Sequence, residues 1–328
     1  MRKVTPSTAR AHDGSSRAVD RPPRLAAGAG LAALALALAA CFAHGPVAAQ
    51  ERKPGDVTAS ASLTGIGQLD SDLDAGGSFR WNGVVVAGNV TWQLSSQFAA
   101  GLDLRYDFER WKFAGPGVFG DTAPWGDINR PAVGLKLAYQ HSSDLAAFVA
   151  PQFEWDYESG ASAGNAQNFG AVVGVTKVFS PTLILGLGAG VFRQIDETKV
   201  FPFVIVRWQI DDRWRLGNPV QAGPAGGAGL ELAYALDANW ELAGGGTYRE
   251  YRFRLKNDGP VPGGIGENRG IPVFARLSRK LGATGRVDLY AGAVVGGRLE
   301  VTSADGNRTT SSDYGAAPLF GITAAMDF

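Results

Sequence analysis

The chain has 328 residues, of which 45 are glycine, and it carries 31 basic and 31 acidic side chains but only three histidines, one cysteine and two methionines. So much glycine argues against a long helical protein, because each glycine inside a helix costs about 1 kcal/mol relative to alanine. The balanced charge argues against a nucleic-acid-binding protein, which would carry an excess or a stripe of basic residues.

Residues 1–49 are predicted to be a signal peptide that is removed. An apolar run over residues 25–43 follows a basic stretch, and Gly45-Pro46 ends it just before the small residues Val47-Ala48-Ala49. This order is typical of a secretory signal, so we predict export and cleavage near Ala49. A retained membrane anchor is the weaker alternative, because the run is barely long enough to span a bilayer and consists mostly of Ala and Gly.

Cys41 leaves a second alternative open, because the sequence Leu38-Ala39-Ala40-Cys41 resembles the lipobox of bacterial lipoproteins. Cleavage after Ala49 is the favoured reading, and it leaves a mature chain without cysteine or disulfides. That chain would carry 25 basic and 29 acidic residues. Residues 50–56 then form a short N-terminal segment, too short for a plug domain, and the domain proper spans residues 57–328.

After Pro54 the chain alternates apolar with other side chains in segments of about ten residues, which is the period of a β-strand. Residues 102–109, for example, interleave four apolar with four charged residues. A bulge is expected at residues 244–246, and the alternation drifts at Gly296-Gly297. About fourteen segments are counted, with twelve as the alternative, and they start near Val57, Phe79, Phe98, Pro131, Leu145, Phe169, Leu183, Val200, Trp214, Gly226, Trp240, Ile271, Val287 and Tyr314.

The links between segments alternate between short polar turns and longer loops. The short links are residues 95–97, 141–144, 180–182, 211–213, 237–239 and 282–285, whereas the longer ones include 114–129, 159–167, 256–270 and 303–313. Short turns at one end and long loops at the other are typical of a transmembrane up-and-down antiparallel β-barrel, in which closure satisfies every backbone group. The predicted fold class is therefore all-β, and outer-membrane lipid is the predicted environment.

The C-terminal segment resembles the signal that the barrel-assembly machinery recognises, with apolar residues at alternate positions and a terminal aromatic. The positions are held by Phe320, Ile322, Ala324, Met326 and Phe328. With the signal peptide and the period of two, residues 57–328 resemble the uncharacterised glycine-rich, porin-like β-barrel families of the bacterial outer membrane. The resemblance implies a fold and a location, and it carries no functional residues across.

Candidate chemistry is scarce in the mature chain, so we predict no enzyme, no cofactor and no metal site. Its one histidine, His141, lies in the turn His141-Ser142-Ser143-Asp144, and four consecutive residues rarely align as a catalytic triad. Metal-ligand spacing is missing. The glycines at 186, 188 and 190 sit in an alternating strand and indicate packing of small lumen-facing residues, not a nucleotide loop.

The lumen is therefore the candidate functional site. Acidic residues predicted to face inward on the third and fifth segments would oppose basic ones on the eleventh and twelfth, and such walls would set a field across a pore. We predict a porin-like channel for small solutes, with a plugged structural barrel or a hydrophobic-solute transporter as alternatives. The lumen-charge candidates are Asp103, Arg105, Asp107, Glu109, Glu154, Asp156, Glu158, Arg252, Arg254, Arg276 and Lys280.

Two further groups of residues bear on these alternatives. A hydrophobic-solute transporter needs an apolar lumen path or a lateral opening, and the apolar residues predicted to face inward are Ile184, Phe192, Phe203 and Ile205. Tryptophans near strand ends are candidates for the aromatic girdles at the membrane interfaces, although Trp81 is equally compatible with packing; these residues are Trp81, Trp92, Trp111, Trp155, Trp208, Trp214 and Trp240.

Overall fold

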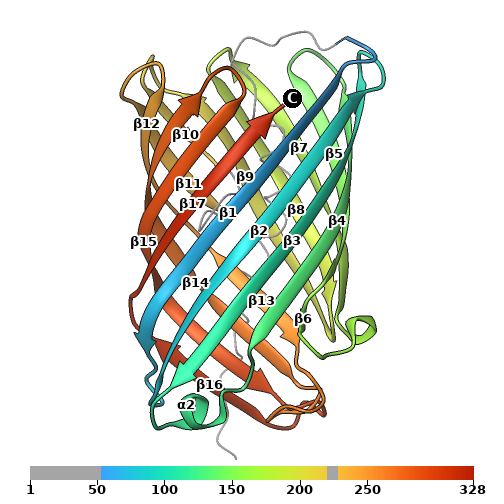
Figure 1. Cartoon of the computed structure of the whole chain (residues 1–328). Coiled ribbons are helices and arrows are strands. Elements are labelled where there is room, and N and C mark those ends of the chain that lie inside the picture. The colour runs from blue at the N-terminus through green and yellow to red at the C-terminus, as the bar shows by residue number, and fades with distance from the viewer. Residues whose placement is uncertain (1–52, 220–227) are drawn as a thin grey trace, which may run out of the picture.

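The computed structural model of the chain describes residues 53–219 and 228–328. The described chain folds into one antiparallel sheet that closes into a barrel, with its strands tilted relative to the barrel axis (Figure 1). The predicted signal peptide and Cys41 lie outside the described residues. The strands are β1 (Val57–Asp72), β2 (Ser78–Gln93), β3 (Phe98–Ala114), β4 (Asp127–Gln140), β5 (Leu145–Trp155), β6 (Tyr157–Glu158), β7 (Gln167–Ser180), β8 (Leu183–Gln194), β9 (Glu197–Gln209), β10 (Trp214–Gly217), β11 (Gly229–Ala235), β12 (Trp240–Thr247), β13 (Arg249–Arg254), β14 (Ile265–Leu281), β15 (Gly285–Thr302), β16 (Thr309–Tyr314) and β17 (Ala317–Asp327).

These segments form fourteen barrel strands, which confirms the predicted number and fold class. Three barrel strands are each interrupted once, so that β5 continues into β6, β12 into β13 and β16 into β17. Sequential neighbours pair antiparallel, and β17 closes the barrel on β1, from Ser60 opposite Asp327 to Gln68 opposite Leu319. Closure leaves few free edges, which a sheet in lipid requires.

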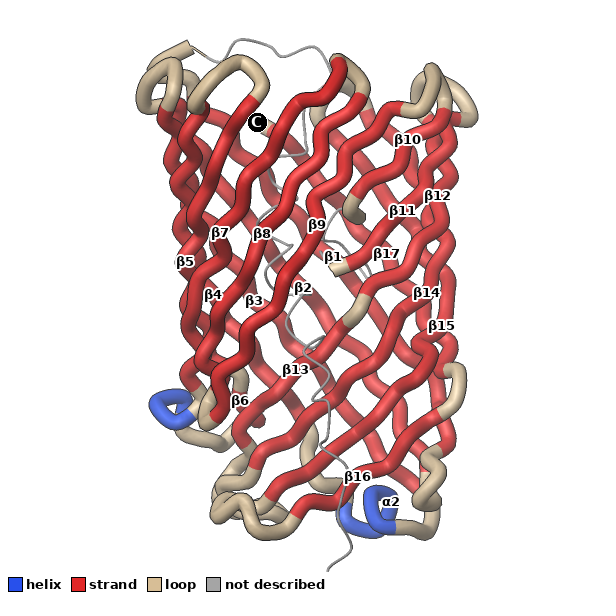
Figure 2. The backbone as a smooth tube through the Cα atoms, turned by 180° about the vertical axis from the view of Figure 1, so that it is seen from behind, coloured by secondary structure: helices blue, strands red, loops and turns tan. Residues whose placement is uncertain are grey.

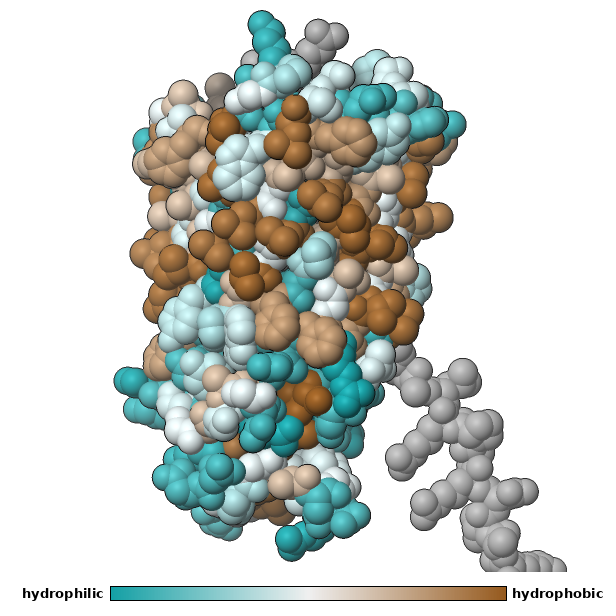
Figure 3. All heavy atoms as spheres, turned by 90° about the vertical axis from the view of Figure 1, so that its right-hand side faces the viewer, coloured by the Kyte–Doolittle hydropathy of each residue, from teal (hydrophilic) through white to brown (hydrophobic). Residues whose placement is uncertain are grey.

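The alternation in the sequence places apolar side chains outside and charged ones inside. In β3, Leu104 and Tyr106 are 54% and 42% exposed on the outer surface, whereas the neighbouring Asp107 and Glu109 are each 4% exposed. On the face shown in Figure 3 the outward apolar side chains gather in a band, and the surface below it is hydrophilic. No helix of the described chain is long and apolar enough to cross a membrane.

The two ends of the barrel differ as the link lengths predict. All six short links are turns at one end, called the turn end below, where the C-terminus also lies (Figure 1). The opposite end, called the loop end, carries the longer links, including the short helix α2 (Val118–Thr122) and the 3-10 turn η1 (Ala163–Asn165). The strands β1 to β3 extend past the apolar band there, because their outward side chains near this end include the exposed Arg80 and Arg110.

The register of strand pairing differs from the prediction at one glycine cluster and agrees with it at another. The bulge expected at residues 244–246 is wrong, because Gly244, Gly245 and Gly246 pair without a shift with β11 and β14. The drift expected at Gly296-Gly297 is confirmed, since the β14–β15 register shifts there, and Gly296 has φ +60°, which favours glycine.

The last strand presents the predicted alternation to the outside. Exposure is 52% for Phe320 and Ile322, 47% for Met326 and 71% for Phe328, while the intervening Thr323 is buried and its hydroxyl shares a hydrogen bond with that of Thr64 on β1. The C-terminal residues therefore form one lipid-facing row. Its recognition by the assembly machinery stays a prediction.

Candidate functional site

A cluster of buried aromatic side chains, called the aromatic plug below, lies in the lumen at the loop end. It consists of side chains that are at most 4% exposed and that stack or meet edge to face, with Trp81 and Trp111 5.8 Å apart and Trp125 and Phe253 5.2 Å apart between ring centroids. Two of the tryptophans proposed for a membrane girdle, Trp81 and Trp111, therefore lie inside the barrel, which corrects that prediction. The plug comprises Phe79, Trp81, Trp111, Phe119, Trp125, Phe253 and Tyr314.

Beside the plug, the inward acidic residues of β3 surround Arg130 of β4. Arg130 is 1% exposed; it forms an ion pair with Glu109, lies 4.0 Å from Asp107, and places its guanidinium 4.0 Å from the ring centroid of Tyr251 on β13. Arg105 binds Asp107 from the same strand, with Nε 2.6 Å from Oδ1. Asp107 and Glu109 are therefore neutralised locally.

The acidic residues of β5 and β6 are also buried, and most have polar partners. Asp156 accepts a hydrogen bond from Asn168 at 2.6 Å, and Glu158 accepts backbone N–H groups of Gly126 and Lys256 at 2.9 and 3.0 Å. Glu154 is 4% exposed on the same inner face. These carboxylates hold strands and loops together at the loop end of the lumen.

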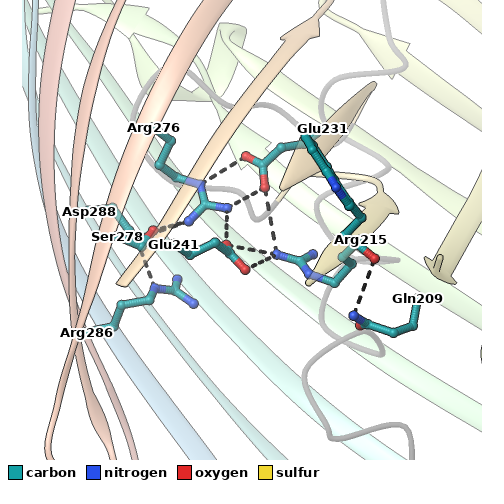
Figure 4. A network of polar contacts seen from close by, with 9 residues as sticks. Gln209, Arg215, Glu231, Glu241, Arg276, Ser278, Arg286 and Asp288 are labelled. Atoms are coloured by element: carbon teal, nitrogen blue, oxygen red, sulfur yellow. Dashed lines mark hydrogen bonds and ion pairs between the residues drawn. The ribbon is translucent and has the colours of Figure 1, made fainter. Parts of the chain in front are cut away.

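A second ion cluster, called the arginine cluster, lines the inner wall nearer the turn end (Figure 4). Arg276 of β14 binds Glu231 of β11 at 3.0 Å and Glu241 of β12 at 2.7 Å, and lies 3.5 Å from Asp288 of β15. Arg215 adds a contact of 3.1 Å to Glu241, and Arg286 one of 3.0 Å to Asp288. Three guanidinium groups thus balance three carboxylates.

The predicted basic residues do not form a separate wall that faces the acidic one. Arg276 belongs to the arginine cluster, and Lys280 is exposed at the turn end. Arg254 of β13 donates to the carbonyl oxygens of Asn165 and Gly263 at 3.1 and 2.9 Å. Arg249, also of β13, lies 4.0 Å from Glu109 of β3, so charges from distant strands meet in one cluster.

An inner apolar patch lies on the wall built by β5, β7, β8 and β9. Phe192 is 1% and Phe203 6% exposed, and Ile205 packs against them, as predicted for an apolar lumen path. The ends of the rings lie against glycines, since a Cβ added to Gly188 would come within 2.1 Å of the Phe203 ring. This agrees with the prediction of packing at the glycines of β8. The patch comprises Phe148, Val172, Phe192, Phe201 and Phe203.

Next to this patch one edge of β9 has no strand beside it in the described chain. β10 pairs with β9 through Gln209, Trp208 and Arg207, and the Asn218 side chain then bridges β9 and β11, at 2.9 Å to Val206 N and 3.0 Å to Gly229 O. Residues 197–203 pair with β8 alone, and β13 passes this edge without pairing with it (Figure 2). We call this stretch the β9 edge.

Ion pairs join the β9 edge to β13 where backbone hydrogen bonds are missing. Lys199 binds Glu250, and Arg252 binds Asp196 at 2.8 Å and Glu197 at 3.5 Å. β13 instead touches β6, where Arg254 N donates to Asp156 O at 2.9 Å. At the loop end the wall thus closes by β13 meeting β6, and the hairpin of β8 and β9 is held by side chains.

The histidine turn carries no catalytic arrangement. The Ser142 hydroxyl donates to Asp144 at 2.7 Å, and this bond lowers the pKa of the Asp144 carboxyl. The His141 ring lies near the Tyr139 ring, with 6.1 Å between the centroids and the two planes tilted by 59°. Within residues 53–219 and 228–328, no three His, Cys, Asp or Glu side chains are grouped so that they could hold a metal ion.

Three solved structures with a similar architecture are distant from this chain in sequence. An outer-membrane channel from Pseudomonas putida F1 aligns with TM-score 0.47 and 10% identity over 86% of this chain and 98% of its own. The Ralstonia pickettii toluene transporter TbuX aligns with TM-score 0.41 and 10% identity over 89% of this chain and 94% of its own. A Pseudomonas aeruginosa FadL homologue aligns with TM-score 0.40 and 11% identity over 91% of this chain and 96% of its own. No family model and no curated protein matches the chain, so the resemblance to an uncharacterised family stays a prediction.

The sequence contained signals for several site residues that the predictions omitted. Trp111 has the same parity in its strand as Asp107 and Glu109, which would have placed it inside. Glu231 is flanked by Leu230 and Leu232 in a short segment, the same outward-inward alternation. The contact of Arg130 with Tyr251 had no such signal, because it depends on which strands meet across the lumen, whereas Asp107 and Glu109 belong to the neighbouring strand β3.

Proposed function

We propose that this protein is a bacterial outer-membrane channel for small apolar solutes, which leave the lumen sideways along the β9 edge. The observation that carries the proposal is that the β9 edge contains Phe201 and Phe203 of the inner apolar patch, while the outward residue Val200 and a further one along the strand, Val204, are exposed on the outer surface. An apolar lumen surface thus adjoins a part of the wall that, in the described chain, pairs on one side only. Backbone groups in lipid otherwise require pairing.

The difference between the two ends of the barrel indicates its orientation in the membrane. Short turns and chain termini face the periplasm in bacterial barrels, and longer loops face the outside. The loop end would then be extracellular, and the β9 edge would lie near the outer leaflet. Export through a cleaved signal peptide and assembly by the barrel-assembly machinery belong to the same proposal.

The aromatic plug argues against a straight aqueous pore. Rings that are at most 4% exposed leave no water-filled path through the plug itself. The neighbouring distant structures include channels for toluene, but at TM-scores below 0.5 their names assign no solute to this chain. The solute class is therefore inferred from the inner apolar patch and the β9 edge.

Porin-like passage of small charged solutes is a second candidate, and the arginine cluster favours it. Arg215, Glu241 and Arg286 are about one third exposed within that cluster, so a polar solute could contact them. In that case the predicted lumen charges near the turn end would select the solute. Single-channel conductance in planar bilayers is expected under this function and not under the first.

Reversible cross-linking of the β9 edge to β13 tests the lateral route. Lys199→Cys with Glu250→Cys places two thiols where an ion pair now joins the strands. A cleavable bis-maleimide should reduce uptake of a radiolabelled aromatic hydrocarbon by intact expressing cells at least tenfold, and a reductant should restore it. The matched control is Arg193→Cys with Thr198→Cys, because these residues already pair between β8 and β9.

Uptake that equals that of cells without the protein would refute transport and leave the plugged structural barrel. Uptake that survives the cross-link between β9 and β13 would refute the lateral route. Equal loss with the control cross-link would do the same, because the effect would then not depend on closing the β9 edge.

A further inference from the structure

A cavity of about 560 Å³ lies at the loop end, apart from the aromatic plug. Four parts of the chain line it: η1 with the start of β7, the end of β8, the end of β13 with its link to β14, and Ala304 in the link between β15 and β16. Its volume is within the range of cavities that bury small organic ligands.

The charge of this cavity is one-sided. Arg193 and Arg254 line it, and the lining described by the structure contains no Asp or Glu. The two bonds that Arg254 makes go to carbonyl oxygens, which hold the guanidinium in place without cancelling its charge. Asp196 follows the lining residue Ile195 but is bound by Arg252 at 2.8 Å.

The side chain of Arg193 is exposed and makes no hydrogen bond or ion pair with another side chain or with the backbone of the described residues. A guanidinium offers several N–H donors in a planar fork that matches a carboxylate, and Arg254 still has donors to spare. Two guanidinium groups of this kind in one cavity favour an anion over a neutral solute.

The rest of the lining is a mixture of amide and apolar groups. The amides of Asn165, Gln167 and Asn257 supply further hydrogen-bond donors, whereas Phe169, Ile195 and Pro262 offer apolar surface. Phe169 is 49% exposed, so its ring is accessible to a ligand. An anion without an apolar part would leave that surface unused.

We propose that this cavity binds a small organic carboxylate with an apolar body, held by Arg193 and Arg254 at its charged end. The inference goes beyond the proposed channel, because equilibrium binding at the loop end requires no passage through the barrel. Loss of transport would leave binding intact, and loss of binding would leave hydrocarbon uptake intact, so the two proposals fail separately.

Calorimetric titration of the full barrel in amphipol with hexanoate tests the site. Hexanol and acetate are the comparison ligands, since one lacks the charge and the other the apolar body. Arg193→Gln should weaken hexanoate binding at least fivefold without affecting the fold, because this side chain has no described partner. Arg308→Gln is the matched control: it removes one positive charge at the same end of the barrel but lies outside the lining.

Hexanoate binding that is at least fivefold tighter than that of both comparison ligands, and that falls with Arg193→Gln but not with Arg308→Gln, supports the proposal. Equal binding of hexanol overturns the role of the two arginines. Equal binding of acetate overturns the inference that the cavity recognises an apolar body on the ligand. No hexanoate binding, or equal weakening in the control, overturns the site as a whole.

Discussion

Replacing Arg130 by Met probes the buried ion cluster beside the aromatic plug. Arg130 is 1% exposed and contacts Glu109, Asp107 and the face of Tyr251. A methionine keeps much of the length of the side chain and removes the charge. The variant therefore leaves two buried carboxylates without their shared cation.

The expected cost follows from the partners that remain. Removing one member of a buried ion pair costs about 3–5 kcal/mol, because the other charge is left uncompensated. Asp107 keeps Arg105 at 2.6 Å, and Glu109 keeps the Trp111 Nε1 donor at 3.0 Å. The loss should therefore fall near the lower limit, at about 3 kcal/mol of unfolding free energy. Adding Glu109→Gln should restore at least half, because it removes the stranded charge.

Urea-induced unfolding of the barrel in lipid vesicles, followed by tryptophan fluorescence, measures these free energies. Arg110→Met is the control, since Arg110 is 55% exposed and binds Asp127 at 3.0 Å, and a pair so exposed to water contributes little to stability. The reasoning is refuted if Arg130→Met and Arg110→Met cost the same, or if the double variant is no more stable than Arg130→Met.

Three further outcomes are expected. Gly188→Ala should cost about 1–3 kcal/mol of unfolding free energy in the same urea assay, because its Cβ would meet an aromatic ring, whereas Gly88→Ala, with 3.5 Å to its nearest neighbour, should cost less than about 0.5 kcal/mol. In single-tryptophan variants, brominated lipid should quench Trp208 and not Trp111; equal quenching would contradict the burial of Trp111. Phe328→Ala should lower the yield of heat-modifiable folded barrel in cells more than Leu281→Ala does, and equal yields would remove the C-terminal aromatic from the assembly signal.

The fold class was within reach of the sequence because its signals are local. A period of two in residues 102–109 and the contrast between short turns and long loops need no knowledge of distant contacts. The number of strands followed from counting such segments, including the short one after Trp214. The bulge expected at residues 244–246 was wrong because glycine permits a bulge without requiring one, and here these residues stay in register with both neighbours.

The sites themselves were harder to predict from the sequence. Inward charges could be identified by parity, but their pairing could not, because Glu109 and Arg249 are 140 positions apart in the chain and meet through the closure of the barrel. Proximity to a strand end suggested a membrane girdle for Trp81 and Trp111, whereas their parity places them in the plug. Position along a strand and the face of that strand are separate properties, and the face decides burial.

The sequence by itself determined the strands, their order, the lipid-facing side of most of them and the difference between the two ends, since each depends on neighbours a few residues away. The tertiary structure alone decided that β13 meets β6, that no strand of the described chain lies beside the β9 edge, which Lys199 and Arg252 hold, and that aromatic rings pack together at one end of the lumen. These features depend on the register and length of strands that are far apart in the chain, and a repeating local pattern carries no information about either.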